Sequence, residues 1–137
     1  MTEEYMAIIS VKTPFNNDFT GELVTGRARV EIGTGEGRLA PYDMLLGALS
    51  SCLYATFLGV VEKKRLVFES CDIEVKGEKR AEIPTTLEWC QVEMRIKGAV
   101  EGKEKHYIEA AKLAGEYCSI YQTLSHVANM SIEVIFD

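Results

Sequence analysis

The fold is decided by the stretch from Pro41 to Cys52, PYDMLLGALSSC, which continues without another proline to about Lys64. Proline is favoured at the first position of a helix, where its missing N–H has no intrahelical partner to lose. Two sets of residues follow at helical spacing: Leu45, Leu49, Cys52, Thr56 and Val60, and Met44, Ala48, Ser51 and Ala55. The stretch therefore predicts one long helix that is apolar on most sides. Such a helix is expected to be buried between two packing partners.

Segments with strand character lie on both sides of this helix. We expect strands at 5–12, 19–24 and 27–32 before it, and at 67–79, 87–97 and 130–136 after it. The strand at 87–97 alternates clearly, and its more apolar side carries Glu88, Cys90, Val92, Met94 and Ile96. Further helices are expected at 103–117 and, shorter, at 118–127. The pattern predicts one α+β domain, residues 1–137, with antiparallel strands on both sides of a central helix.

Composition excludes several classes of protein. The chain has 137 residues, of which 47% are hydrophobic, so it can build a core without disulfides or metals. Fifteen Lys and Arg against 21 Asp and Glu give a net charge of −6, which argues against a nucleic-acid partner. The first residues, MTEEYMAIIS, carry acids where an export signal needs bases. The longest apolar stretch is interrupted well short of the ~18 residues that span a bilayer. We therefore expect a cytoplasmic protein with no membrane partner.

The four cysteines are Cys52, Cys71, Cys90 and Cys118. None forms a C-x-x-C pair and the spacing does not fit zinc, so no metal or cofactor is expected. Cys71 and Cys90 lie in predicted strands and are expected to be packing residues. Cys52 and Cys118 have two interpretations. Both can be small buried hydrophobic residues, or they can form a thiol pair in which one attacks and the other resolves.

The segment 40–52, APYDMLLGALSSC, and the segment 116–120, EYCSI, together resemble the two cysteine motifs of the OsmC/Ohr family. The two cysteines lie at a separation close to that of the family, and the strand–turn–strand at 75–84 matches the connection between the motifs. The resemblance covers nearly the whole chain and fits a shorter OsmC-like branch. It implies an OsmC-like fold in an intertwined homodimer, which would cover a helix that is apolar on most sides.

The resemblance also implies an activity, the thiol-dependent reduction of organic hydroperoxides. Cys52 would attack the peroxide as a thiolate and become a sulfenic acid. Cys118 would condense with it to a disulfide, which an external thiol reductant would reduce. A second possibility is an OsmC-like dimer that binds a small apolar ligand with little or no peroxidase activity. A third is a redox sensor in which the same disulfide alters a surface that contacts a partner.

The resemblance implies a thiolate-activating cation, held by an acid before the cysteine helix. Catalytic relatives use an N-terminal arginine, and this chain has none before Arg27. Arg27, Arg29 and Arg38 are the candidates, although their positions match poorly. Lys12 lies nearer the expected place but cannot make the planar fork of an arginine. Asp43 best matches the acid. It is a candidate catalytic residue, or a first-turn acid that favours the helix dipole.

Overall fold

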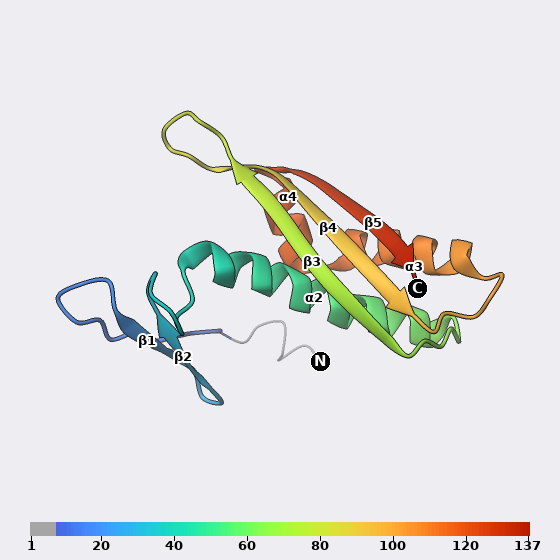
Figure 1. Ribbon diagram of the computed structural model, residues 1–137, viewed down its shortest axis with the longest axis horizontal. Coiled ribbons are helices and arrows are strands. Elements are labelled where there is room, and N and C mark those ends of the chain that lie inside the picture. Colours follow the sequence, from blue (N-terminus) through green and yellow to red (C-terminus); the bar gives the residue numbers. More distant parts are fainter. Residues whose placement is uncertain (1–7) are drawn as a thin grey trace. The chain divides into compact units, whose positions relative to one another are not determined.

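The computed structural model describes residues 8–137, and the elements are shown in Figure 1. The chain divides into two compact units, one ending at Met44 and one spanning 45–137. The elements in chain order are β1 (Gly21–Val24), β2 (Arg29–Ile32), α2 (Pro41–Lys63), β3 (Ser70–Lys79), β4 (Leu87–Lys97), α3 (Glu104–Tyr117), α4 (Ser119–Ser125) and β5 (Asn129–Phe136). The α+β class is confirmed. The assignment of residues 1–137 to a single domain stays a prediction.

The N-terminal unit contains a two-stranded antiparallel sheet. Val24 pairs with Arg29, and Gly21 pairs with Ile32. The strand expected at 5–12 is not present over residues 8–12, where Lys12 makes only an isolated bridge to Val24. Its first three residues lie outside the described part of the chain.

Helix α2 begins at Pro41, as the sequence predicts, and ends at Lys63. Its start is capped by Asp43, whose Oδ2 accepts a 2.8 Å hydrogen bond from the backbone N–H of Ala40. This is the returning half of a capping box, in which an acid at the third position satisfies a free donor at the helix start. Beyond the helix, Arg65 has a φ of 58°, which turns the chain towards the sheet.

One stripe of α2 is buried, and it consists of Leu49, Leu53, Phe57 and Val61. The spacing of four residues places these side chains on one face of the helix. The sequence predicts no apolar segment long enough to span a bilayer, and this is wrong for α2. By length and composition alone, α2 could cross a membrane. Its buried stripe packs into the core of the described structure.

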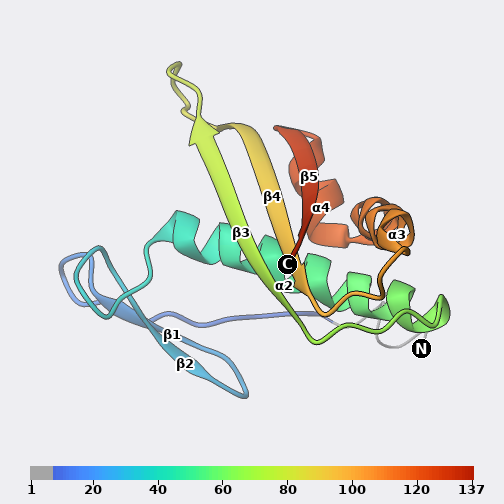
Figure 2. The ribbon, with the colours of Figure 1, turned by 45° about the vertical axis from the view of Figure 1, so that its right-hand side comes forward.

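The second unit contains a three-stranded sheet in the order β3-β4-β5, with the helices against one face (Figures 1 and 2). β3 and β4 are antiparallel, whereas β4 and β5 are parallel. The expectation of only antiparallel strands is therefore wrong for the last pair. Parallel neighbours need a long crossover, and α3 with α4 supplies it.

The apolar side of β4 is the buried side, as predicted. Its buried residues are Leu87, Cys90, Val92, Met94 and Ile96. Glu88 does not share this side. An irregularity in the β3–β4 register, where Glu78 pairs with Trp89 and Lys79 with Leu87, leaves Glu88 without a partner on β3. Such a bulge places two consecutive residues out of alternation, so Leu87 takes the buried face and Glu88 is exposed.

Helix α3 lies close against β5. A Cβ added at Gly115 would come within 2.9 Å of Ile132 Cδ1, so the absence of a side chain permits this approach. At the other end of the helix, the ring of Tyr107 packs edge-on against Phe136. The Tyr107 hydroxyl donates to the carbonyl of Val67 and accepts from the N–H of Val100 at 3.0 Å. These contacts fix α3 on the sheet and so determine where the α3–α4 junction lies.

Candidate active site

The structure brings Cys52 and Cys118 close together. Cys52 lies at the midpoint of α2, and Cys118 is the single residue between α3 and α4. Cys118 has an extended backbone (φ −71°, ψ 115°), which interrupts the helical path and turns its side chain towards α2. Each thiol influences the pKa of the other, and both cysteines are free. The sequence separates them by 66 positions, so this proximity depends on the packing of the crossover.

The environment of Cys52 favours its thiolate. Partial burial alone would raise the pKa of Cys52, but several hydrogen bonds act in the opposite direction. The backbone N–H of Ile120 and the thiol of Cys118 are two of the donors. The other two are the hydroxyl and the backbone N–H of Ser119, whose Oγ lies 4.0 Å from Cys52 Sγ. Together they hold the pKa of Cys52 below its ordinary value, because each stabilises the charged form.

The environment of Cys118 has the opposite effect. Its side chain is fully buried, and burial is the main cause that raises the pKa of Cys118 above its ordinary value. The neighbouring Cys52 raises the pKa of Cys118 further. The Cys118 sulfur also caps α4 by accepting a 3.4 Å hydrogen bond from the backbone N–H of Tyr121. Cys118 is therefore kept as a neutral thiol, whereas the neighbouring Cys52 ionises more readily than an ordinary cysteine.

This asymmetry defines what the pair can do chemically. A thiolate is the nucleophilic form of cysteine, whereas a neutral thiol can donate a hydrogen bond to it. Two titratable groups whose environments move their pKa values apart have distinct chemical roles. Here Cys52 is suited to act as the nucleophile, and Cys118 is suited to react with the product that forms on the Cys52 sulfur.

The predicted arginines lie in the N-terminal unit, where two of them have carboxylate partners. Arg29 pairs with Glu22 at 2.8 Å, and Arg38 pairs with Glu31 at 3.1 Å. Arg27 is exposed in the turn between β1 and β2. Within residues 45–137, no charged side chain contributes to the lowered pKa of Cys52. Activation of Cys52 by Arg27, Arg29 or Arg38 stays a prediction, as does a catalytic role for Asp43.

Ser119 and Ile120 are the contributors to the site that the sequence reasoning missed. They are the first two residues of α4, and the first N–H groups of a helix have no intrahelical acceptor. A signal was present in the sequence, since a cysteine followed by serine at the start of a helical segment predicts free donors near a thiol. What the sequence lacked was the position of α2 opposite that segment.

Cys71 and Cys90 have environments that keep them neutral. Burial and the charge of Asp72 raise the pKa of Cys71 to about 11. Burial also raises the pKa of Cys90, which is 1% exposed. Thiols of this kind are chemically inert, as expected for packing residues. In the part of the chain that is described, no three His, Cys, Asp or Glu side chains cluster in a way that could hold a metal ion.

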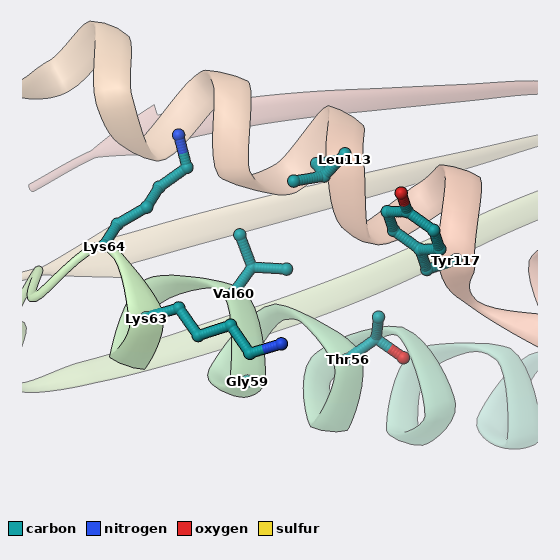
Figure 3. Close-up of a pocket in the computed structure, with 7 residues that line it drawn as sticks. All are labelled: Thr56, Gly59, Val60, Lys63, Lys64, Leu113 and Tyr117. Carbon is teal, nitrogen blue, oxygen red and sulfur yellow. The ribbon is translucent and has the colours of Figure 1, made fainter.

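A pocket of about 460 Å³ lies between α2 and α3, and two of its lining residues are close in sequence to the cysteines (Figure 3). Thr56 lies one helical turn after Cys52, to whose carbonyl it donates a 2.9 Å hydrogen bond, and Tyr117 directly precedes Cys118. Val60, Leu113 and the ring of Tyr117 give the pocket an apolar wall. Lys63 and Lys64 lie at its far end. The pocket can therefore accept an apolar molecule of moderate size.

Comparison with known proteins places this arrangement in a family. The family model described as OsmC-like protein matches residues 33–133. Protein YhfA of Escherichia coli is 26% identical over 121 residues, which cover 85% of this chain and 90% of that protein. A hypothetical protein of Aquifex aeolicus has a crystal structure with a TM-score of 0.81 and 27% identity, and the match covers 96% and 99% of the two chains.

The fold is also shared with an organic hydroperoxide resistance protein of Legionella pneumophila. That structure has a TM-score of 0.70 and 12% identity, and the match covers 94% of this chain and 98% of that one. The family model spans both cysteines and the whole of α2, α3 and α4. The chain therefore belongs to the OsmC-like protein family.

Proposed function

We propose that this protein is a thiol-dependent peroxidase that reduces organic hydroperoxides, with Cys52 as the nucleophile and Cys118 as the resolving thiol. The observation that carries the proposal is the proximity of two free cysteines whose pKa values move apart. The Ser119 hydroxyl and the first N–H groups of α4 all favour the Cys52 thiolate, an arrangement that packing alone does not require. The family's organic hydroperoxide resistance proteins give further support.

The chemistry follows from the two environments. The Cys52 thiolate attacks the terminal oxygen of the hydroperoxide, a sulfur–oxygen bond forms, and the oxygen–oxygen bond breaks. The leaving alkoxide takes the electron pair and a proton from solvent, which gives an alcohol, and Cys52 becomes a sulfenic acid. The Cys118 thiol then displaces water from that sulfenic acid to form a disulfide. An external dithiol reduces the disulfide, becomes oxidised itself and restores both thiols.

The pocket between α2 and α3 supports the choice of an organic rather than an inorganic peroxide. Tyr117, which directly precedes Cys118, lines it, and Val60 and Leu113 complete an apolar wall. Apolar surface favours a substrate that carries hydrocarbon, and hydrogen peroxide carries none.

A homodimer in the cytoplasm is part of the proposal. Leu58 on α2 is 40% exposed and Val127 after α4 is 60% exposed in the single chain. A second copy would remove such apolar surface from water, as the intertwined dimer of the family implies. A reducing cytoplasm would supply the thiols that regenerate the enzyme.

The test is a peroxidase assay coupled to a dithiol, with cumene hydroperoxide and hydrogen peroxide compared at equal concentration. Wild type should consume the organic peroxide faster, and Cys52→Ser should abolish turnover. Cys71→Ser is the matched control, because it removes a half-buried thiol outside the pair and should retain activity. If folded wild type turned over neither peroxide, the peroxidase proposal would fail and an OsmC-like ligand-binding dimer would replace it.

A further inference from the structure

The hydroxyl of Ser119 points to a specific role in the cysteine pair. Its Oγ lies 4.0 Å from Cys52 Sγ, a long contact for neutral groups but within the range of a hydrogen bond to sulfur. Across residues 8–137, this is the only polar contact of that hydroxyl. The carbonyl of Ser119 is engaged separately, by the hydroxyl of Thr123 at 2.8 Å. The side chain is therefore available to serve Cys52.

The other groups that lower the pKa of Cys52 are the backbone N–H groups of Ile120 and Ser119 and the thiol of Cys118. Cys52 lies at the midpoint of α2, and the field of a helix dipole fades within about one turn of the helix end. The charged side chains within residues 45–137 make no contribution at Cys52. The Cys118 thiol does donate to Cys52, but it is the group consumed in forming the disulfide. Among the side chains that act on Cys52, the Ser119 hydroxyl is the one that the cycle does not consume.

We propose that the Ser119 hydroxyl is a side-chain donor that stabilises the Cys52 thiolate. The inference rests on the proposed function, because it assigns the group that prepares the same nucleophile. The backbone N–H groups of Ser119 and Ile120 assist, but only the hydroxyl depends on the identity of the residue. Ser119 neither gains nor loses a proton. Its hydrogen bond stabilises the sulfur before the attack.

Three variants isolate the hydroxyl. Ser119→Ala removes it and keeps the backbone N–H, and the exposed position means that the fold should be retained. Ser119→Thr keeps a hydroxyl at the same position. Ser125→Ala is the matched control, because Ser125 ends the same helix and its hydroxyl donates to the carbonyl of Gln122. A fourth variant, Ser119→Pro, removes both the hydroxyl and the N–H.

Proline suits this position for two reasons. It is tolerated at the first residue of a helix, and the residue before it must be extended, as Cys118 already is. Ser119→Pro should therefore keep the backbone path and show the combined effect of both Ser119 donors on Cys52.

The experiment measures the rate at which iodoacetamide alkylates Cys52 across pH, followed by mass spectrometry of the peptide that contains Cys52. In Ser119→Ala the midpoint of the pH profile should rise, and the rate near neutral pH should fall roughly three- to tenfold, the effect of one lost hydrogen bond. Ser119→Pro should show a larger fall. Ser119→Thr should restore most of the rate, and Ser125→Ala should match wild type. A wild-type profile in Ser119→Ala would overturn the inference.

This measurement separates the inference from the proposed function, because alkylation uses no peroxide. If wild type reduced no hydroperoxide but Ser119→Ala still shifted the alkylation profile, the role of Ser119 would stand and the peroxidase proposal would fail. If wild type were an active peroxidase and Ser119→Ala kept both its alkylation profile and its turnover, the peroxidase would stand and the inference would fail.

Discussion

Replacing Tyr107 by phenylalanine should destabilise the protein while leaving its packing intact. The ring of Tyr107 is fully buried and packs against Phe136, and phenylalanine keeps that contact. The substitution removes only the hydroxyl, which donates to the carbonyl of Val67 and accepts from the N–H of Val100. Each net hydrogen bond contributes about 1 kcal/mol, so the free energy of unfolding should fall by about 2 kcal/mol.

The expected shift in Tm follows from the size of the chain. Unfolding entropy is about 2.1 cal/mol/K per residue, so 137 residues give about 0.29 kcal/mol/K. A loss of about 2 kcal/mol therefore lowers Tm by about 7 °C. Thermal unfolding followed by circular dichroism measures this shift, at one fixed protein concentration because a dimer makes Tm depend on concentration.

Tyr117→Phe is the matched control for Tyr107→Phe. Tyr117 belongs to the same helix but is 72% exposed, so loss of its hydroxyl should be nearly neutral. If Tyr107→Phe lowered Tm by no more than Tyr117→Phe, the reasoning that this hydroxyl ties two backbone segments to α3 would be refuted.

Three further predictions concern the candidate site. Cys118→Ser should let Cys52 react once and then accumulate as a sulfenic acid, seen as a dimedone adduct by mass spectrometry; continued turnover with a dithiol would contradict a resolving role. Peroxidase activity should fall as pH decreases through the pKa of Cys52, because the thiolate is protonated there, and at lower pH than for a free cysteine, because that pKa is lowered; a profile that matches an unperturbed cysteine would be inconsistent with the site. Asp43→Ala should cost about 1 kcal/mol of stability through loss of the helix cap, whereas Asp43→Asn keeps an acceptor for Ala40 and should lose less; if Asp43→Asn proved stable but inactive in the peroxidase assay, Asp43 would act in catalysis as well as in the cap.

The helices and strands that depend on a local sequence pattern could be predicted from the sequence. The proline start of α2, the alternation in β4 and the amphipathic spacing in α3 placed these three elements within a residue or two of their observed bounds. The parallel pairing of β5 was not predicted, because the alternation within a strand is the same whether its neighbour runs parallel or antiparallel. The direction is set by the crossover through α3 and α4, which is a property of the whole second unit.

The site was predictable only in part for a similar reason. The two motifs pointed to Cys52 and Cys118, but the donors around Cys52 come from a helix that begins at Ser119. That proximity arises when α3 docks on β5 through Gly115, and no local pattern in either segment encodes it. The sequence reasoning sought a cation, whereas the described contacts of Cys52 are with neutral donors.

The parallel pairing of β5 with β4 also bears on the order of folding. β3 and β4 form a local hairpin, but the partner of Trp89 on the other side is Asn129, 40 positions along the chain. Closing so long a loop costs entropy before its contacts form, so pairing of β5 is expected to be a late step. Until then one edge of β4 lacks its partner, and Cys118 has no fixed place beside α2. A partly folded chain therefore carries four ordinary thiols, and the environment that lowers the pKa of Cys52 forms only when the sheet is complete.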